Sequence, residues 1–145
     1  MTRDCFFKAK RDNWQSLPKE DWWIKGYHFC MIDYYVNRVR HFIIPIGINC
    51  NSEPSKEEMW EEVVPETISQ IIGLSDKNNK QLCENDIIRY NNKLFKIVWV
   101  PECAHFAARP LQENNWSPCI NTGTIQTAEI IGNIFDNYEL LEAAK

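Results

Sequence analysis

The stretch DIIRYNNKLFKIVWV, from Asp86 to Val100, decides the fold class of this chain. Two runs rich in β-branched and aromatic residues flank the pair Asn91-Asn92, and asparagine tolerates the left-handed backbone of a tight turn. The stretch therefore predicts an antiparallel β-hairpin. Pro101 is expected to end the second strand, because proline cannot donate a hydrogen bond to a sheet.

Similar runs lie on both sides of this hairpin, whereas helical periodicity is scarce. Further strands are expected over residues 5–11, 22–31, 34–44, 67–72, 105–109 and 125–135. Residues 31–33 are expected to form the turn that leads into the run 34–44. Alternation along that run places Arg38 and Arg40 side by side on one face.

Short helices are predicted at only two places, near 55–63 and near 137–144. Ser55 and Glu58 fit the capping-box pattern at the first of these. Asn137 is a suitable cap for the second, because its side chain can accept a hydrogen bond from an N–H of the first turn.

These elements predict a mainly β fold, a small α+β arrangement of two small β subdomains or barrels that share a core. A length of 145 residues favours a single domain over 1–145, with possible subdomains 1–64 and 65–145. Hydrophobic residues make up 44% of the chain and aromatic residues 12%, which is enough apolar area to exclude disorder.

Charge and hydropathy exclude further classes of protein. The formal net charge is -4, which argues against binding of long nucleic acid. No run approaches the roughly 20 apolar residues of a transmembrane helix. The sequence begins MTRDC and shows no apolar signal core. We therefore expect no membrane contact and a cytoplasmic location.

Motifs for metal binding and catalysis are absent from the sequence. Its six cysteines include no C-x-x-C pair, and the closest approach to a ligand pair is Cys103 with His105. No metal and no cofactor are expected. P-loop, G-x-S-x-G and H-E-x-x-H motifs are all missing, so we expect a protein that is not an enzyme. Asp76 and Asp86 are explained as turn-forming residues.

Three separated blocks of the sequence resemble the YopX-like proteins of phages and prophages. The first block is FKAKR from Phe7 with WIKGY from Trp23; the second is PETISQ from Pro65, GLSDKNNK from Gly73 and ENDII from Glu84; the third is EIIGNIFDN from Glu129 with ELL from Glu139. The resemblance implies a mostly β protein with small subdomains that forms homo-oligomers. The family has no established general biochemical activity, so the resemblance does not indicate one for this chain.

Departures from the family pattern are few. Asn79 and Asn85 stand where the family usually has glycine, and asparagine can enter the same left-handed turns. The least family-like segments are 15–21, 46–55 and 102–124, and a specialised function is expected there. Phage accessory proteins often act on the host and its defences, so the resemblance implies the cytoplasm of a host cell.

Aromatic residues interleaved with cations predict a site for a nucleotide-derived ligand, because a ring stacks on a base while cations hold phosphate. The candidate ligand-binding residues are Lys10, Arg11, Trp23, Tyr27, Arg38, Arg40, Trp99, Arg109 and Trp116. We expect a non-enzymatic phage accessory protein that binds and sequesters a small host immune signal as a homo-oligomer.

Two other interpretations stay open. The chain could be a protein–protein inhibitor or interaction module that contacts a host protein through the acidic segment 57–62 or through 102–124. An enzyme that degrades such a signal is the least favoured interpretation. Each aromatic residue could instead fill the core, and each arginine could simply face water.

Overall fold

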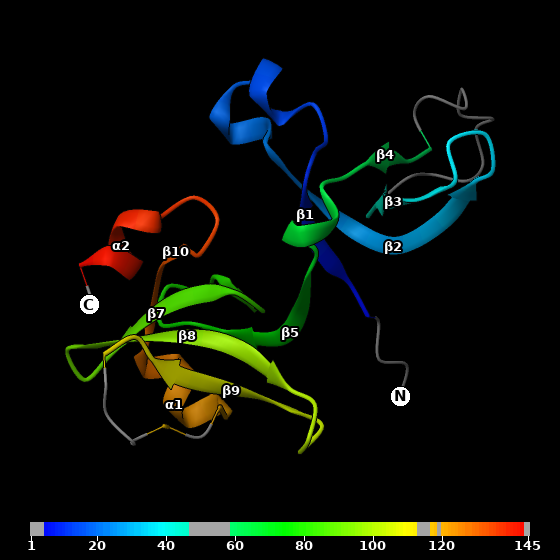
Figure 1. Ribbon diagram of the computed structural model, residues 1–145. Helices are drawn as coiled ribbons and strands as arrows, with labels where there is room; N and C mark the ends of the chain where they lie inside the picture. Colours follow the sequence, from blue (N-terminus) through cyan, green and yellow to red (C-terminus); the bar gives the residue numbers. More distant parts are fainter. Residues whose placement is uncertain (1–4, 47–58, 113–116, 119, 144–145) are drawn as a thin grey trace. The chain divides into compact units, whose positions relative to one another are not determined.

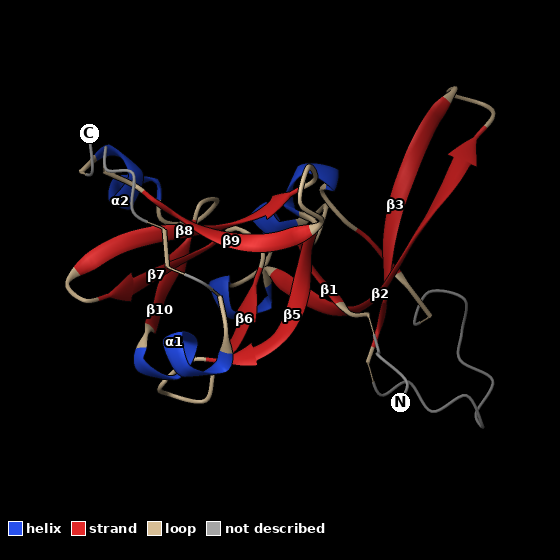
Figure 2. Ribbon diagram, turned by 90° about the horizontal axis from the view of Figure 1, so that it is seen from below, coloured by secondary structure: helices blue, strands red, loops and turns tan. Residues whose placement is uncertain are grey.

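The computed structural model describes residues 5–46, 59–112, 117–118 and 120–143 (Figure 1). Its contacts divide the chain into two compact units, Met1–Gln70 and Ile71–Lys145. Both units are built from antiparallel strands, which confirms the mainly β fold (Figure 2). Neither sheet closes into a barrel within the described ranges.

The first unit is a sheet whose strand order is β4-β3-β2-β1-β5. Its strands are β1 (Phe7–Lys10), β2 (Trp23–Asp33), β3 (Arg38–Pro45), β4 (Glu61–Glu62) and the start of β5 (Ser69–Ser75). Short 3-10 helices cover Trp14–Ser16, Lys19–Asp21 and Pro65–Thr67. The core residues are Ala9, Ile24, Ile43 and Val63, with Phe7 and Ile68 packed against them.

A long hairpin of β2 and β3 extends from this sheet. In the described chain β1 pairs with β2 only as far as Gly26, whereas β2 and β3 stay paired from Gly26 and Pro45 to Asp33 and Arg38. Figure 2 shows the two strands running together to the turn. We call residues 27–44 the arm and residues 31–40 the arm end.

Local chemistry explains how the arm begins and turns. A Cβ atom placed on Gly26 would lie 1.8 Å from the backbone oxygen of Ile44, so the close crossing of β2 and β3 requires glycine. At the turn, Asp33 Oδ1 accepts from the N–H groups of Tyr35 (3.1 Å) and Val36 (3.4 Å). Asn37 follows with a φ of 48°, in the left-handed region that asparagine tolerates.

The second unit holds the predicted hairpin. Its sheet has the order β10-β7-β8-β9, formed by β10 (Glu129–Asn133), β7 (Asp86–Tyr90), β8 (Lys93–Val100) and β9 (His105–Pro110). Strand β6 (Gln81–Cys83) pairs with β5. Asn91 and Asn92 have φ values of 49° and 59°, the left-handed pair that a two-residue hairpin turn needs.

Two short helices complete the second unit, α1 (Thr122–Thr127) and α2 (Tyr138–Glu142), and α2 confirms the helix predicted near 137–144. The core residues of this unit are Leu82, Ile88, Phe95, Ile97, Ala108, Ile125, Ala128 and Ile130. Each of these two clusters of buried residues lies within one unit. Each unit therefore buries its own apolar face.

The helix predicted near 55–63 is wrong over residues 59–63, which the structure describes. Residues 47–58 lie outside the described ranges, and the remainder contains strand β4 instead of a helix. Glu61 and Glu62 pair with Ile43 and Phe42 of β3, and this long-range pairing overrides the local capping pattern.

Two further boundaries differ from the sequence prediction. Strand β2 extends through the expected turn at 31–33, and the turn lies at 34–37. The run 125–135 begins inside α1, because the side chain of Asn121 caps that helix by accepting from the N–H of Thr124 at 3.0 Å.

Candidate binding site at the end of the arm

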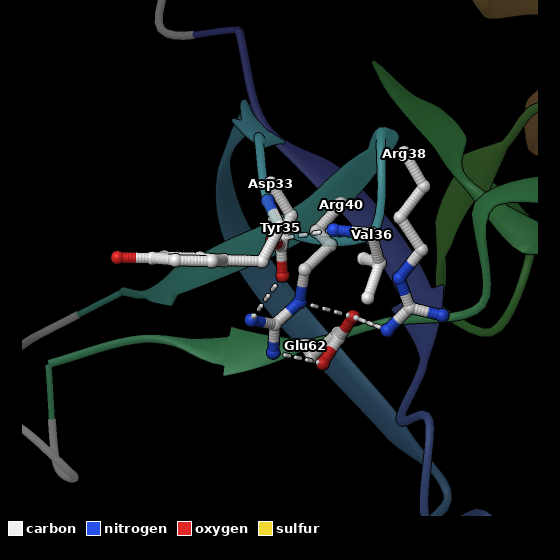
Figure 3. A network of polar contacts seen from close by, with 6 residues as sticks. All are labelled: Asp33, Tyr35, Val36, Arg38, Arg40 and Glu62. Carbon is white, nitrogen blue, oxygen red and sulfur yellow. Dashed lines mark hydrogen bonds and ion pairs between the residues drawn. The ribbon is translucent and has the colours of Figure 1, made fainter.

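Two arginines and two carboxylates form a network on one face of the arm end (Figure 3). Arg40 donates to both oxygens of Glu62, from Nε at 2.9 Å and from Nη2 at 2.5 Å. Arg40 Nη1 also lies 3.8 Å from Asp33, and Arg38 Nη2 lies 3.6 Å from Glu62. The bidentate pair fixes the Arg40 guanidinium, while the Arg38 side chain stays 62% exposed.

Electrostatics at this network follow from the same contacts. The hydrogen bonds from Arg40, and then its charge, hold the pKa of Glu62 below its usual value. The hydrogen bond to Glu62 raises the pKa of Arg40 in turn. Asp33 and Glu62 balance Arg38 and Arg40, so the network as a whole carries no net charge.

Apolar side chains of the arm end stay exposed: Met31 shares the face of the network, whereas Ile32 and Val39 point to the opposite face. Tyr34 is 85% exposed and Tyr35 is completely so. The other exposed apolar residues of the arm end are Met31, Ile32, Val36 and Val39. A hollow of about 280 Å³ is lined by Met31, Ile32, Asp33, Tyr34, Tyr35 and Arg40. Aromatic rings and a guanidinium thus border one depression.

A histidine pair lies on the opposite face of the arm. His28 Nε2 and His41 Nδ1 are 2.9 Å apart, and their rings stack with centroids 5.2 Å apart. Burial, and then the charge of His41, lowers the pKa of His28. One ring must donate and the other accept, so this hydrogen bond exists only while at least one histidine is neutral.

Lys10 and Trp23, two of the predicted ligand-binding residues, contact each other. The ammonium of Lys10 lies 4.3 Å from the ring centroid of Trp14, 4.7 Å from that of Trp22 and 5.4 Å from that of Trp23. Lys10 is 5% exposed. The cation is enclosed by the rings of its own chain, an arrangement that favours it through cation–π attraction.

Arg11 and Tyr27 also have partners within the first unit. Arg11 Nε lies 2.5 Å from Glu61, and Tyr27 packs on Phe6 with ring centroids 4.9 Å apart. Glu61 and Glu62 are successive residues of β4, so their side chains point to opposite faces. Arg11 and Arg40 therefore bind on opposite faces and cannot hold one phosphate together.

The remaining predicted residues belong to the second unit. Trp99 of β8 packs edge-on against Phe106 with centroids 5.0 Å apart. Arg109 of β9 is exposed and pairs across the strands with Lys96. Trp116 lies outside the described residues. Among the described members of the nine predicted residues, Arg38 and Arg40 both contact the carboxylate of Glu62.

Sequence reasoning missed Asp33 and Glu62. Tyr34 and Tyr35 had been placed in a strand rather than at the turn. Asp33 carried a usable signal, since aspartate before a turn often accepts from the N–H two residues on. Glu62 carried none, because it reaches Arg40 through strand pairing across 22 positions of sequence.

The family-like motifs of the second unit have structural partners. Asp76 is 4% exposed, and its carboxylate accepts from the N–H groups of Asn78, Lys80 and Ile130, each at 2.9 Å. Burial alone would raise the pKa of Asp76, but these hydrogen bonds outweigh it and leave the pKa lowered. A hollow of about 590 Å³ lies beside this turn, lined by Gly73, Leu74, Ser75, Asp76, Lys77, Asn79, Thr122 and Gln126.

Fold and site together define a two-unit, mainly antiparallel β protein whose long hairpin presents tyrosines around a neutral ion-pair network. Residues 32–142 match the family described as YopX protein, and the chain belongs to this family, which is found in phages and prophages. A comparison with curated protein sequences gives no match. No helix in the described part of the chain is long and apolar enough to cross a membrane.

A solved structure shares the fold. The chain is similar to the crystal structure of protein EF1440 from Enterococcus faecalis, with 20% sequence identity and a TM-score of 0.57. The alignment covers 97% of this chain and 99% of that one, so both units have counterparts there.

Proposed function

We propose that this YopX-family protein is a non-enzymatic phage accessory protein that binds and sequesters a small nucleotide-derived host signal at the arm end, as a homo-oligomer. The observation that supports this proposal is the hollow beside Arg40. There Tyr34 and Tyr35 border the same depression as a guanidinium, with Arg38 adjacent to it through Glu62. A nucleotide-binding site needs an aromatic ring to stack on the base and a cation to hold the phosphate.

Charge at the arm end limits which ligand fits. Glu62 fixes the Arg40 guanidinium but also neutralises it, whereas Arg38 is 62% exposed and has only a longer contact of 3.6 Å. A neutral network attracts a ligand with one phosphate group more readily than a polyphosphate. The proposed ligand is therefore a base or nucleoside with a single phosphate or phosphodiester group per site.

The test is calorimetric titration of the full chain with adenosine monophosphate and with a cyclic dinucleotide, beside native mass spectrometry of protein from infected cells. We expect bound mass that is released chemically unchanged on unfolding. The variant Arg38→Ala/Arg40→Ala should lose this binding, whereas Arg89→Ala in the second unit, also ion-paired, should keep it. Binding that survives the double change, or a ligand released in altered form, would refute the proposal.

Contact with a host protein is the second candidate function. The observation that favours it is the exposure of Tyr34 and Tyr35, because tyrosines are enriched in protein interfaces. The acidic segment supports it less, since Glu61 and Glu62 are counter-ions of Arg11 and Arg40. Here an arm-end variant such as Tyr34→Ser/Tyr35→Ser should lose an identified host partner while nucleotide probes never bind.

A further inference from the structure

We propose that His28, His41 and Cys30 form a binding site for a divalent transition metal ion such as Zn²⁺, on the face of the arm opposite the arginine network. The two histidines supply ring nitrogens and the cysteine supplies a thiolate sulfur, which are the donor atoms that Zn²⁺ prefers in proteins. The site belongs to the first unit alone and does not depend on the proposed nucleotide site.

Strand pairing brings these three side chains to one place. Cys30 of β2 pairs directly with His41 of β3, and His28 pairs with Ile43. His28, Cys30 and His41 therefore share one face of the arm, because paired residues point to the same side and alternate residues of a strand do so too. His28 and His41 are 13 positions apart in the sequence, so no local ligand spacing indicates the site.

The two nitrogens already lie close to the separation that a metal ion requires. His28 Nε2 and His41 Nδ1 are 2.9 Å apart. Two nitrogens that each lie about 2.0–2.1 Å from a tetrahedral zinc ion are about 3.3 Å from each other. An ion can thus replace the hydrogen bond once the nitrogens separate by about 0.4 Å. The ring of Phe7 packs against that of His28 with centroids 5.6 Å apart, which limits rotation of this imidazole.

A rotation of the Cys30 side chain supplies the third ligand. As the side chains lie, no three histidine, cysteine, aspartate or glutamate groups among the described residues converge closely enough to hold a metal ion. Cys30 is a free, exposed cysteine, so its thiol has room to turn about the Cα–Cβ bond. Cβ atoms of directly paired residues are about 4.5–5.5 Å apart, which puts the Cys30 sulfur within reach of an ion bound to His41. The fourth position would be open to water, as it is in zinc sites with three protein ligands.

Protonation and charge on this face favour a cation. Burial, and then the charge of His41, lowers the pKa of His28, so this ring is neutral near pH 7 and can act as a ligand. Within the two described strands β2 and β3, the residues that share this face include no lysine or arginine, since Lys25, Arg38 and Arg40 point to the other side. A doubly charged cation therefore meets no fixed positive charge from these strands.

Metal binding should change the protonation of the site in a defined way. Starting from two neutral rings, the histidine that donates the hydrogen bond carries its proton on its other nitrogen once the metal is bound, so that both facing nitrogens offer a lone pair. The Cys30 thiol releases its proton to solvent as the thiolate binds. Binding of one ion should therefore release about one proton, which titrations in buffers of different ionisation enthalpy would measure.

The first test is calorimetric titration of the untagged, reduced full chain with Zn²⁺. We expect one bound ion per chain. His28→Gln and His41→Gln should each raise the Kd at least about tenfold, because even a changed outer-shell partner of a ligand costs that much. His105→Gln is the matched control and should leave the Kd unchanged, since His105 is the third histidine of the chain and is exposed on β9 of the second unit. Circular dichroism would check that each variant is folded.

Cobalt absorption gives a second measurement that is specific for the sulfur ligand. With Co²⁺ in place of Zn²⁺, the unchanged protein should show a thiolate-to-metal charge-transfer band in the near ultraviolet. Cys30→Ser should abolish this band, whereas Cys103→Ser, at an exposed cysteine of the second unit, should retain it. Cys30 is exposed, so the serine variant should fold like the unchanged protein.

Three results would overturn the proposal: an unchanged protein that binds no Zn²⁺, a Kd that neither histidine variant alters, or a charge-transfer band that is absent from the unchanged protein or survives Cys30→Ser. The proposed function fails separately. Arg38→Ala/Arg40→Ala should lose the nucleotide probe and still bind Zn²⁺ with an unchanged Kd, because these arginines point to the opposite face.

Discussion

Replacing Gly26 with alanine should separate the arm from its sheet. Gly26 pairs with Phe7 of β1 on one side and with Pro45 of β3 on the other. A Cβ atom at this position would lie 1.8 Å from the oxygen and 2.6 Å from the carbon of the Ile44 carbonyl group. Both atoms are backbone, so no side-chain rotation can relieve the overlap.

The cost can be estimated from that geometry. Ordinary contact between a carbon and an oxygen needs about 3.3 Å, so β3 must move by roughly 1.5 Å relative to β2. Such a shift disrupts two or three neighbouring hydrogen bonds at about 1 kcal/mol each, in addition to an overpacking cost of about 1–3 kcal/mol. We expect Gly26→Ala to lower the free energy of unfolding by about 3–6 kcal/mol, a large fraction of the usual total.

Urea unfolding followed by tryptophan fluorescence measures this effect, because Trp14, Trp22, Trp23 and Trp60 all belong to the first unit. Gly123→Ala is the control, since the nearest atom to its added Cβ is Asn121 Oδ1 at an ordinary 3.4 Å. Within helix α1 that change should be neutral or stabilising by up to about 1 kcal/mol. If Gly26→Ala unfolds within about 0.5 kcal/mol of the unchanged protein, the close crossing of β2 and β3 is wrong.

Three further predictions concern titration and buried polar groups. The pKa of His28 is lowered in the folded state, so the unfolded chain binds more protons below a pH of about 6.5, and the stability should fall as the pH drops through that value. Urea midpoints measured at pH 7.5 and 5.5 test this prediction. The variant His28→Gln should reduce the difference between the two midpoints. Asp76→Asn should destabilise the second unit by about 2–4 kcal/mol, because one amide oxygen cannot replace a carboxylate that accepts three backbone N–H groups; unchanged thermal melting would contradict this role. Glu62→Gln should increase the affinity for adenosine monophosphate severalfold in calorimetry, because it leaves Arg38 and Arg40 without their shared counter-ion. Weaker binding would show instead that Glu62 is needed to orient Arg40.

Local sequence patterns predicted what depends on neighbours along the chain. The hairpin at Asn91-Asn92 and the shared face of Arg38 and Arg40 both follow from the alternation and turn chemistry of adjacent residues. The helix predicted near 55–63 is wrong, because Glu61 and Glu62 form strand pairs with β3 and ion pairs with Arg11 and Arg40. These long-range contacts outweigh the helical preference of the neighbouring residues. Long-range strand pairing is not encoded in a single local pattern.

The candidate site was predictable in its composition rather than in its location. The sequence analysis singled out rings and cations, and the structure brings some of them into contact, such as Lys10 with Trp14 and Trp22. Sequence alone could not show that Lys10 contacts the ring of Trp23 within the chain, whereas Arg40 lines a hollow together with the exposed Tyr34 and Tyr35. Burial separates these two cases, and burial is a property of the folded chain.

The enclosure of Lys10 also determines how the protein can be handled chemically. A lysine that is 5% exposed, with its ammonium against indole rings, should react slowly with amine-directed reagents and resist trypsin while the protein is folded. Lys19 and Lys25 lie nearby in the sequence and are exposed. Coupling through surface amines should therefore label those positions first, and the appearance of label on Lys10 would report the opening of the first unit directly.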